Sequence, residues 1–330
     1  MREIRVRMMD TIDSGVGLSY DKVLVTGGAG FIGSHTVDAL LEEGSEVWVL
    51  DNLSTGTGRN LRRWKNNPKF HFRKNTVTRY NVVDSLVGKV EAVVHLAAIV
   101  SPYLSVKKPD IVNEANVFGT LNVLRAAAKQ KVKRVVFASS SSVYGNQTTL
   151  PISESNPLEP VTPYGASKLS AEKYCGAFHR TYGVSTISLR YFNVYGERQS
   201  ANPYSGVIAI FANCLSRGRQ PTIYGDGEQT RDFIHVSDVV TANLRALETE
   251  RGIGEAFNIG TGQATNIKGL HELLAGLLNR PDILPVYTDA RPGDIKHSYA
   301  NVTKAKDVLG FQAKIELKPG VAHLVHTPFR

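Results

Sequence analysis

The stretch 25-VTGGAGFIGSH-35 directly follows the apolar run 22-KVLV-25 and leads into a segment with helical periodicity. Within it, Gly27, Gly30 and Gly33 are spaced Gly-x-x-Gly-x-x-Gly. Glycines at this spacing permit a tight turn after a strand, let a pyrophosphate approach the backbone, and allow the next helix to pack closely. The stretch therefore predicts a strand, then a phosphate-binding turn at the positive end of a helix.

Asp51 ends the next strand-like run, 46-EVWVL-50. An acid about 20 residues beyond such a turn accepts hydrogen bonds from the adenosine ribose of a dinucleotide and repels a 2′-phosphate. A glycine-rich turn with a capping aspartate is the competing interpretation, and the strand-turn-helix context argues against it. The pattern predicts NAD, rather than NADP, as the cofactor.

Strand-like runs alternate with helix-period segments through the first half of the chain. Strands are expected at 22–26, 46–50, 91–95, 134–139 and 185–191, and helices at 31–43, 110–130 and 163–182. Strands rich in Val and Leu on both faces, alternating with helices, predict a doubly wound parallel sheet of the α/β class, a Rossmann fold. Helical periodicity returns at 237–249 and 266–279, and the tail 321–330 shows no helix pattern.

The simplest division of the chain has three parts. Residues 1–20 form an N-terminal arm, residues 21–191 the NAD-binding domain, and residues 192–330 a smaller, loop-rich substrate domain. Segments near 230–262 can return to the NAD-binding domain. The second part has the length of an ordinary single domain.

Composition excludes several classes of protein. The 330 residues are 42% hydrophobic and 21% charged, as is usual for a globular protein. No apolar run approaches the ~20 residues that span a bilayer, and residues 1–20 contain no signal-peptide core. Cys175 and Cys214 are too few for a disulfide framework and lie in no metal-type cluster, so a cytoplasmic protein is expected. The net charge of +9 is dispersed, which favours a solvated surface over a nucleic-acid partner.

Two later segments carry groups for proton transfer. In 163-PYGASKLSAEKY-174, Tyr164 and Lys168 are spaced i, i+4 and share one face of the expected helix. A tyrosine has a pKa near ~10, and a lysine ammonium beside an oxidised nicotinamide would favour its phenolate. A phenolate can take a proton from a sugar hydroxyl while hydride leaves the carbon, and a serine of 138-ASSSSVYG-145 can hydrogen-bond the same oxygen. An ordinary amphipathic helix would explain the Tyr-x-x-x-Lys pair alone, but not its place after the glycine turn and the serine-rich strand end.

Nine motifs follow one another in a specific order. They are VTGGAGFIGSH (25–35), LDNLSTG (50–56), VHLAA (94–98), SSSSVYG (139–145), PYGASK (163–168), LRYFNVYG (189–196), GDGEQTRDFIHVSD (225–238), NIGTG (258–262) and RPGDIKHS (291–298). On these motifs the chain resembles the extended short-chain dehydrogenase/reductase family over residues 21–315, and within it the UDP-hexose 4-epimerases. The resemblance implies an isomerase with tightly bound NAD, a UDP-sugar substrate, and a homodimer formed through the helices at 110–130 and 163–182.

The resemblance also implies a role for each matching position. Cofactor-binding residues would be Gly27, Gly30, Phe31, Ile32 and Gly33 at the pyrophosphate, Asp51, Asn52, Ser54 and Gly56 at the adenosine ribose, and Ala97 and Ala98 in the cleft. Ser140 would be the catalytic serine, Tyr164 the base, and Lys168 the group that binds the nicotinamide ribose and lowers the pKa of the base. Substrate-binding residues would be Asn193, Val207, Ile208, Arg231, Arg291, Asp294 and Ser298, together with Ser140 and Tyr164.

Departures from the family pattern narrow the reaction. Dehydratases of this branch carry Asp-Glu, and decarboxylases Ser-Glu, directly after the catalytic serine or threonine, where this chain has Ser141 and Ser142. Without those carboxyl groups a 4-epimerase is favoured; a UDP-hexuronate 4-epimerase or decarboxylase, and a non-catalytic NAD-binding regulator, remain the alternatives. Two cofactor positions also differ, since Thr76 replaces an aspartate at the adenine and Val100 lies near a missing lysine.

Ser298 bears on the substrate. In the family, the fourth residue after the position of Asp294 limits the space for the C2 substituent of the sugar, and a tyrosine there is similar to enzymes restricted to glucose and galactose. The small side chain of Ser298 suggests that UDP-N-acetylglucosamine and UDP-N-acetylgalactosamine are accepted as well. The competing interpretation is that loop geometry, not side-chain size, decides.

Overall fold

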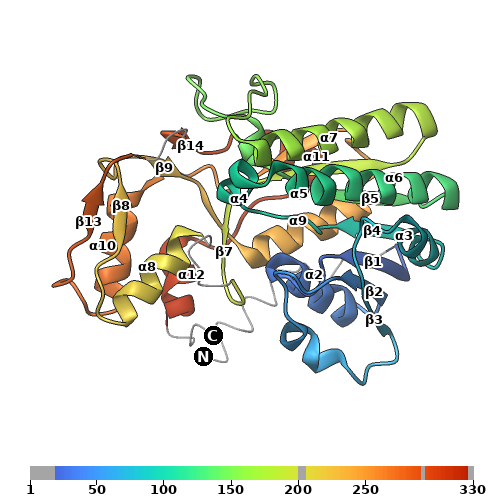
Figure 1. The fold of residues 1–330 in the computed structure, drawn as a ribbon, viewed down its shortest axis with the longest axis horizontal. Coiled ribbons are helices and arrows are strands. Elements are labelled where there is room, and N and C mark those ends of the chain that lie inside the picture. Colours follow the sequence, from blue (N-terminus) through green and yellow to red (C-terminus); the bar gives the residue numbers. More distant parts are fainter. Residues whose placement is uncertain (1–18, 200–205, 291–293, 326–330) are drawn as a thin grey trace.

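The centre of the molecule is a seven-stranded parallel sheet in the order β11-β6-β5-β4-β1-β2-β3 (Figure 1). The computed structural model describes residues 19–199, 206–290 and 294–325. The strands are β1 (Lys22–Thr26), β2 (Glu46–Asp51), β3 (Phe70–Lys74), β4 (Ala92–His95), β5 (Arg134–Ser140), β6 (Thr186–Tyr191) and β11 (Ala256–Ile259). The strand order reverses between β1 and β4, and ligands of open α/β sheets bind at the carboxyl ends of the strands flanking such a switch point. The predicted doubly wound α/β fold is confirmed.

Helices cover both faces of this sheet. One face is covered by α2 (Phe31–Glu42), α9 (Val236–Glu248) and α11 (Thr303–Leu309), the other by α3 (Tyr80–Val87), α6 (Gly119–Gln130) and α7 (Pro163–Tyr182). In β1, Val23 and Val25 enter the core on one face and Leu24 the core on the other, and all three are fully buried. The continuous apolar run of this strand is therefore explained by burial on both sides.

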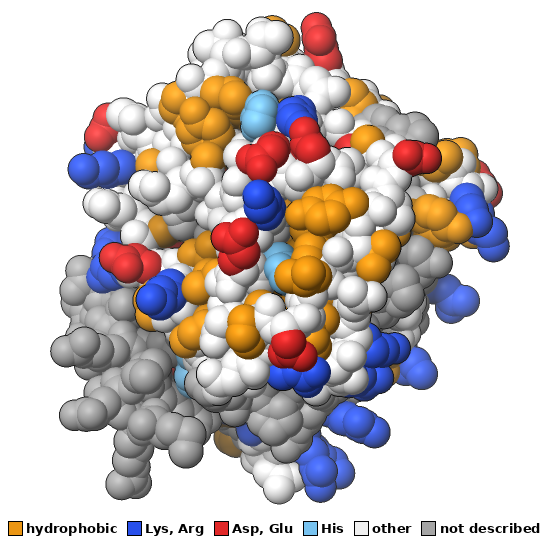
Figure 2. All heavy atoms as spheres, turned by 90° about the vertical axis from the view of Figure 1, so that its left-hand side faces the viewer, with side chains coloured by type: hydrophobic (Ala, Val, Ile, Leu, Met, Phe, Trp, Pro, Cys, Tyr) orange, Lys and Arg blue, Asp and Glu red, His pale blue; other side chains and the backbone are white. Residues whose placement is uncertain are grey.

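Three small sheets and three helices form the C-terminal part of the molecule, on the left of Figure 1. The sheets pair β7 (Asn193–Tyr195) with β10 (Phe233–His235), β9 (Thr230–Arg231) with β12 (Thr265–Asn266) and β14 (His297–Ser298), and β8 (Thr222–Tyr224) with β13 (Val286–Thr288). The helices are α8 (Val207–Ser216), α10 (Ile267–Leu277) and α12 (Leu317–Val325), which share one hydrophobic core. Figure 2 shows that acidic and basic side chains are interspersed over much of the outer face of this part.

The chain crosses between the two parts more than once. α9 and β11 follow residue 192 in sequence but belong to the central sheet and its covering layer. The division at residue 191 stays a prediction. Among the described residues, no helix has the length and apolar character required to cross a membrane.

Several elements differ from the sequence-based expectations. The tail does contain a helix, α12, whose Val321 and Leu324 are buried. Its apolar pattern is too short to be recognised in the sequence. A glycine, Gly320, also interrupts this pattern, because a Cβ there would overlap the Tyr195 hydroxyl. β3 and β11 were not expected, since β3 is an edge strand with a half-exposed sequence and β11 contains a buried asparagine. The helix expected at 110–130 is α5 (Pro109–Asn113), a π-helical turn η2 (Glu114–Phe118) and α6.

Candidate active site

The glycine turn forms a bare cradle at the switch point. Gly27 has φ +71°, a conformation that favours glycine, and its N–H donates to the Leu50 carbonyl over 2.8 Å. A Cβ on Gly27 would lie 2.8 Å from the backbone nitrogen of Ala97, and one on Gly33 would overlap the Gly27 carbonyl. Only hydrogen fits at either position, so α2 begins directly against the turn and directs its first N–H groups at the space above it. This geometry fits a dinucleotide pyrophosphate.

Asp51 lies at the carboxyl end of β2, beside this cradle. It is 8% exposed, and its two oxygens accept the N–H groups of Ala29 over 2.9 Å and Leu53 over 2.7 Å. These bonds hold the carboxylate in place and leave further lone pairs for ribose hydroxyls, so the position fits the adenosine of NAD. Of the other predicted ribose residues, Asn52 accepts from the Ser54 N–H over 2.9 Å within its own loop. Gly56 packs so closely on Ala29 that a Cβ would lie 2.8 Å from it.

The segment directly after β4 in the sequence forms the floor of the expected cofactor cleft. Thr26 Oγ1 accepts the Ala97 N–H over 3.2 Å and shares a hydrogen bond of 2.6 Å with His95 Nδ1, which places the predicted Ala97 and Ala98 beside the glycine turn. Burial lowers the pKa of His95 to about 3, with a smaller contribution from the charge of Lys168, so the ring is neutral. His95 therefore has a structural role through its hydrogen bonds, and the motif VHLAA alone did not indicate this role.

Asn116 is a site residue that sequence reasoning missed. It lies in the π-helical turn η2 and is 1% exposed. Its Oδ1 accepts the Ile99 N–H over 2.8 Å, while its Nδ2 donates to the Ile99 carbonyl over 3.2 Å and to Ser167 Oγ over 3.0 Å. Ser167 in turn donates to the Tyr164 carbonyl over 2.7 Å. In the sequence, Asn116 is only an asparagine within an otherwise helical stretch, which is weak evidence for a function. The π-helical turn around it, a feature that is frequent at functional sites, is visible only in the structure.

The predicted catalytic residues come together at the ends of β5 and α7. Ser140 ends β5, and its hydroxyl accepts the Ser142 N–H and donates to Ser142 Oγ, each over 3.2 Å. The start of α7 approaches this turn closely, since a Cβ on Gly165 would lie 2.6 Å from the Ser142 carbonyl oxygen. Tyr164 is 5% exposed; burial raises the pKa of its phenol above the ordinary value, and a hydrogen bond with Ser140 lowers it. The start of α7 therefore brings Tyr164 to the turn that follows Ser140.

Lys168 lies one turn further along α7. It is 3% exposed, and its Nζ lies over the Phe137 ring, 4.5 Å from the ring centre. Burial lowers the pKa of Lys168 to about 8, while the nearby Cys175 and Glu172 act to raise it. The ammonium is thus held in an apolar setting.

A buried network of polar side chains holds α7 against the central sheet. Arg190 of β6 donates to both oxygens of Glu172 in α7, over 2.5 and 3.0 Å, and to the Tyr144 hydroxyl over 2.7 Å. Glu172 also accepts the Ser139 hydroxyl over 2.6 Å, and Tyr144 donates to Asn258 of β11 over 2.6 Å. The network ties β5, β6 and β11 to the helix that carries Tyr164 and Lys168.

The predicted substrate residues are spread over the C-terminal part. Arg231 of β9 donates to Asp294 over 2.8 Å, and Ser298 of β14 lies opposite Arg231 in the parallel register. Ser298 is 5% exposed. Asn193 begins β7, next to Asp232, whose carbonyl accepts the Asn193 N–H over 2.9 Å.

Two further predicted substrate positions begin α8, and one cannot be placed. Val207 is half-buried, whereas Ile208 is 1% exposed and packs in the core of the C-terminal part. Arg291 lies outside the described residues.

Asp232 organises this region and was not singled out by sequence reasoning. It is fully buried, and its carboxylate accepts the N–H groups of Thr261, Gly262 and Ala300 over 2.8 to 3.1 Å. Burial raises the pKa of Asp232, and these hydrogen bonds lower it. The carboxylate holds the loop after β11 and the segment after β14 together.

Comparison with known proteins identifies the family. The sequence pattern of the NAD-dependent epimerase/dehydratase family matches residues 23–260. The chain belongs to this family. Membership confirms the resemblance proposed from the sequence motifs and makes NAD the cofactor.

Several members of the NAD-dependent epimerase/dehydratase family are closely similar. A UDP-glucose 4-epimerase of Mycolicibacterium smegmatis is 40% identical over 92% of this chain and 97% of its own length. The structure of a Thermotoga maritima UDP-glucose 4-epimerase with UDP-glucose has a TM-score of 0.88 at 40% identity, covering 92% of this chain and 97% of that one. A UDP-N-acetylglucosamine 4-epimerase of Methanobrevibacter ruminantium, solved with UDP-N-acetylmuramic acid, has a TM-score of 0.88 at 38% identity, covering 93% and 97%. Relatives named as epimerases confirm the predicted isomerase class.

Proposed function

We propose that this protein is a UDP-sugar 4-epimerase. The observation that carries the proposal is the burial of Tyr164 beside the turn that follows Ser140, with the buried ammonium of Lys168 one turn further along α7. NAD, which Gly27, Gly33 and Asp51 would hold, would supply reversible hydride transfer at C4 of the sugar. As its phenolate, Tyr164 would take the proton of the C4 hydroxyl, and a hydrogen bond from Ser140 would orient the phenolic oxygen. The 4-keto sugar turns over in the pocket, and Tyr164 gives the proton back.

The residues that follow Ser140 support epimerisation over decarboxylation or dehydration. Ser141 and Ser142 are both half-buried, and Ser142 already shares a hydrogen bond with Ser140. A hydroxyl has a pKa far too high to act as the acid or base that a carboxyl group would provide at this position. Plant UDP-glucuronic acid decarboxylases are similar to this chain at 35% identity, so a direct test of the reaction is needed.

The purified enzyme should therefore be incubated with UDP-glucose, UDP-N-acetylglucosamine and UDP-glucuronate separately, and the products resolved by chromatography. We expect an epimer mixture from the first two substrates and no release of CO2 from the third. Tyr164→Phe is the control: it removes the base and should lower turnover by a factor of about 10² to 10⁴ while NAD stays bound. CO2 release, or an active Tyr164→Phe variant, would refute the assignment.

The acceptance of N-acetylated sugars is proposed from Ser298. This small residue pairs with Arg231 across β9 and β14, and Arg231 is the guanidinium expected to bind phosphate. Space beside it would admit an acetamido group at C2 of the sugar. Ser298→Tyr should abolish turnover of UDP-N-acetylglucosamine and keep that of UDP-glucose, with Ser298→Ala as the matched control that keeps both. Equal loss on both sugars, or no loss on either, would refute this specificity.

A further inference from the structure

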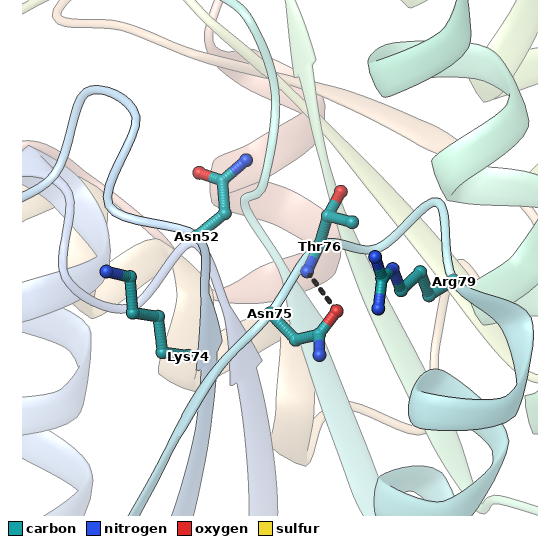
Figure 3. Close-up of a pocket in the computed structure, with 5 residues that line it drawn as sticks. All are labelled: Asn52, Lys74, Asn75, Thr76 and Arg79. Atoms are coloured by element: carbon teal, nitrogen blue, oxygen red, sulfur yellow. Dashed lines mark hydrogen bonds between the residues drawn. The ribbon is translucent and has the colours of Figure 1, made fainter.

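A pocket of about 350 Å³ lies at the carboxyl ends of β2 and β3. It is lined by Asn52, Lys74, Asn75, Thr76 and Arg79 (Figure 3). The strand order shows what reaches it. The glycine turn follows β1, Asp51 ends β2, and β3 is the next strand outward, so a dinucleotide with its pyrophosphate at the turn and its ribose at Asp51 extends its purine base to the end of β3. This placement rests on the proposed cofactor site.

The side chains around this purine pocket include no carboxylate. Lys74 and Arg79 are donors only, and both are exposed at the rim. Asn75 Oδ1 accepts the Thr76 N–H over 2.9 Å, and in Figure 3 this oxygen points toward Thr76. The part of the Asn75 amide left for a ligand is its NH2 group, another donor.

Asn52 Oδ1 accepts the Ser54 N–H over 2.9 Å, so the Asn52 amide likewise has its NH2 group left for a ligand. Thr76 supplies a further polar group, and its hydroxyl has no fixed direction. Its Oγ1 accepts the Thr78 N–H over 3.3 Å and shares a hydrogen bond of 3.1 Å with Thr78 Oγ1, in which either atom can donate. A hydroxyl can rotate to accept a hydrogen bond from an amino group or to donate one to a carbonyl oxygen, whereas a carboxylate can only accept. The purine edge therefore meets groups that do not require an amine.

We propose that this pocket is permissive at C6 of the purine, so that the protein binds dinucleotides of 6-oxopurines as well as those of 6-aminopurines. The ligand class is a nicotinamide purine dinucleotide, with hypoxanthine as the 6-oxo case. A carboxylate facing a 6-oxo group would place two acceptors against each other, and such an unpaired contact costs free energy beside the half-buried Thr76. The donors Lys74, Asn75 and Arg79 instead match the oxo group.

The test is a competition for binding that involves no sugar. The purified holoenzyme is incubated with an equimolar excess of NAD and nicotinamide hypoxanthine dinucleotide until the bound composition stops changing, then desalted, and the released dinucleotides are quantified by chromatography. At that plateau the bound ratio is the ratio of the two affinities. We expect wild type to bind the two within about threefold of each other.

Two isosteric variants sharpen the test. Thr76→Asp introduces an acceptor-only group that can still accept the Thr78 N–H, and we expect it to shift the ratio at least about tenfold toward NAD. Thr76→Asn has the same shape without the charge, and its amide can present either edge, so the ratio should stay near that of wild type. A wild-type preference for NAD above about tenfold, or an unchanged ratio in Thr76→Asp, would overturn the proposal. Loss of epimerase activity with this ratio intact would refute only the proposed function, and failure to retain either dinucleotide would overturn the pocket and the cofactor site together.

Discussion

At the scale of single residues, Lys168 is a cation kept in an apolar setting. Burial lowers its pKa to about 8, and the Phe137 ring covers its Nζ. If the protonated amine is the form that favours the Tyr164 phenolate, activity is present below this pKa and is lost as the pH rises through it. The rate of epimerisation should therefore fall above about pH 8.

The control for this pH prediction is Lys168→Arg. A guanidinium stays charged throughout the accessible range, so the decline at alkaline pH should disappear even though the absolute rate is lower. A wild-type rate that stays level up to pH ~10, where an ordinary lysine titrates, would contradict the predicted loss of charge. The same decline in Lys168→Arg would assign it to another group.

The residues proposed to carry chemistry were singled out from the sequence because each follows a strand or starts a helix with its own local signature. Gly27, Asp51 and Ser140 lie at the carboxyl ends of β1, β2 and β5, and Tyr164 lies at the start of α7. Asn116, by contrast, acts through contacts across the fold, to Ile99 and Ser167. No periodicity records such contacts, so residues of this kind emerge only from the structure.

At the scale of elements, the packing of α2 on the glycine turn is fixed by one missing methyl group. We expect Gly33→Ala to abolish NAD retention, because its Cβ would overlap the Gly27 carbonyl and push the helix away from the turn. The amount of NAD that copurifies with the protein measures this.

Gly276→Ala is the matched control for that change. It also lies in a helix, α10, but a Cβ there meets nothing within 4 Å. This substitution should keep NAD and stabilise the protein by roughly 0.5–1 kcal/mol, the usual gain for alanine within a helix. If both variants keep their NAD, close packing at Gly33 is not what forms the cofactor site.

The Arg190–Glu172 pair joins β6 to α7, and both side chains are almost fully buried. Removing one partner leaves the other charge buried and unpaired. Glu172→Leu or Arg190→Met alone should therefore lower the free energy of unfolding by about 3–5 kcal/mol. The double variant should lose much less than the sum, since no unpaired charge remains. Urea unfolding of the four proteins measures the coupling; additive losses would show that the pair acts through its separate contacts to Ser139 and Tyr144.

The elements predicted from the sequence are those with long, repeated patterns. The helix expected at 163–182 matches α7, and the strand expected at 22–26 matches β1. β3, β11 and α12 were not predicted because their buried positions depend on neighbours that come from other parts of the chain. Burial by tertiary contact, rather than local propensity, decides such elements.

At the scale of the whole molecule, one layer of helices presents apolar side chains to solvent. α4 (Pro102–Lys107), α5, η2 and α7 pack against one another (Figure 1). Their exposed apolar side chains include Tyr103, Val106, Ile111, Phe118 and Tyr174, which are 40 to 66% exposed. A patch of this kind is typical of an interface, so the homodimer stays our proposal, with this layer as its contact surface.

This proposal predicts the mass of the protein in solution. Light scattering should give twice the chain mass of 36.1 kDa for wild type and a single chain mass for Ile111→Asp, because a carboxylate would be buried unpaired in the interface. Leu284→Asp is the matched control: Leu284 is 65% exposed but belongs to the C-terminal part, so this variant should stay dimeric. A monomeric wild type would refute the proposed interface.

Asn116 links two parts of the molecule, the segment after β4 and the start of α7, through its hydrogen bonds. The Asn116 amide hydrogen-bonds both backbone groups of Ile99, in the floor of the cofactor cleft, and also donates to Ser167 Oγ in α7. Ser167 in turn donates to the Tyr164 carbonyl. The cleft floor and the catalytic helix therefore cannot part without breaking the same buried contacts. A movement that separated Ile99 from α7 would break these buried hydrogen bonds and would shift the turn that carries Tyr164.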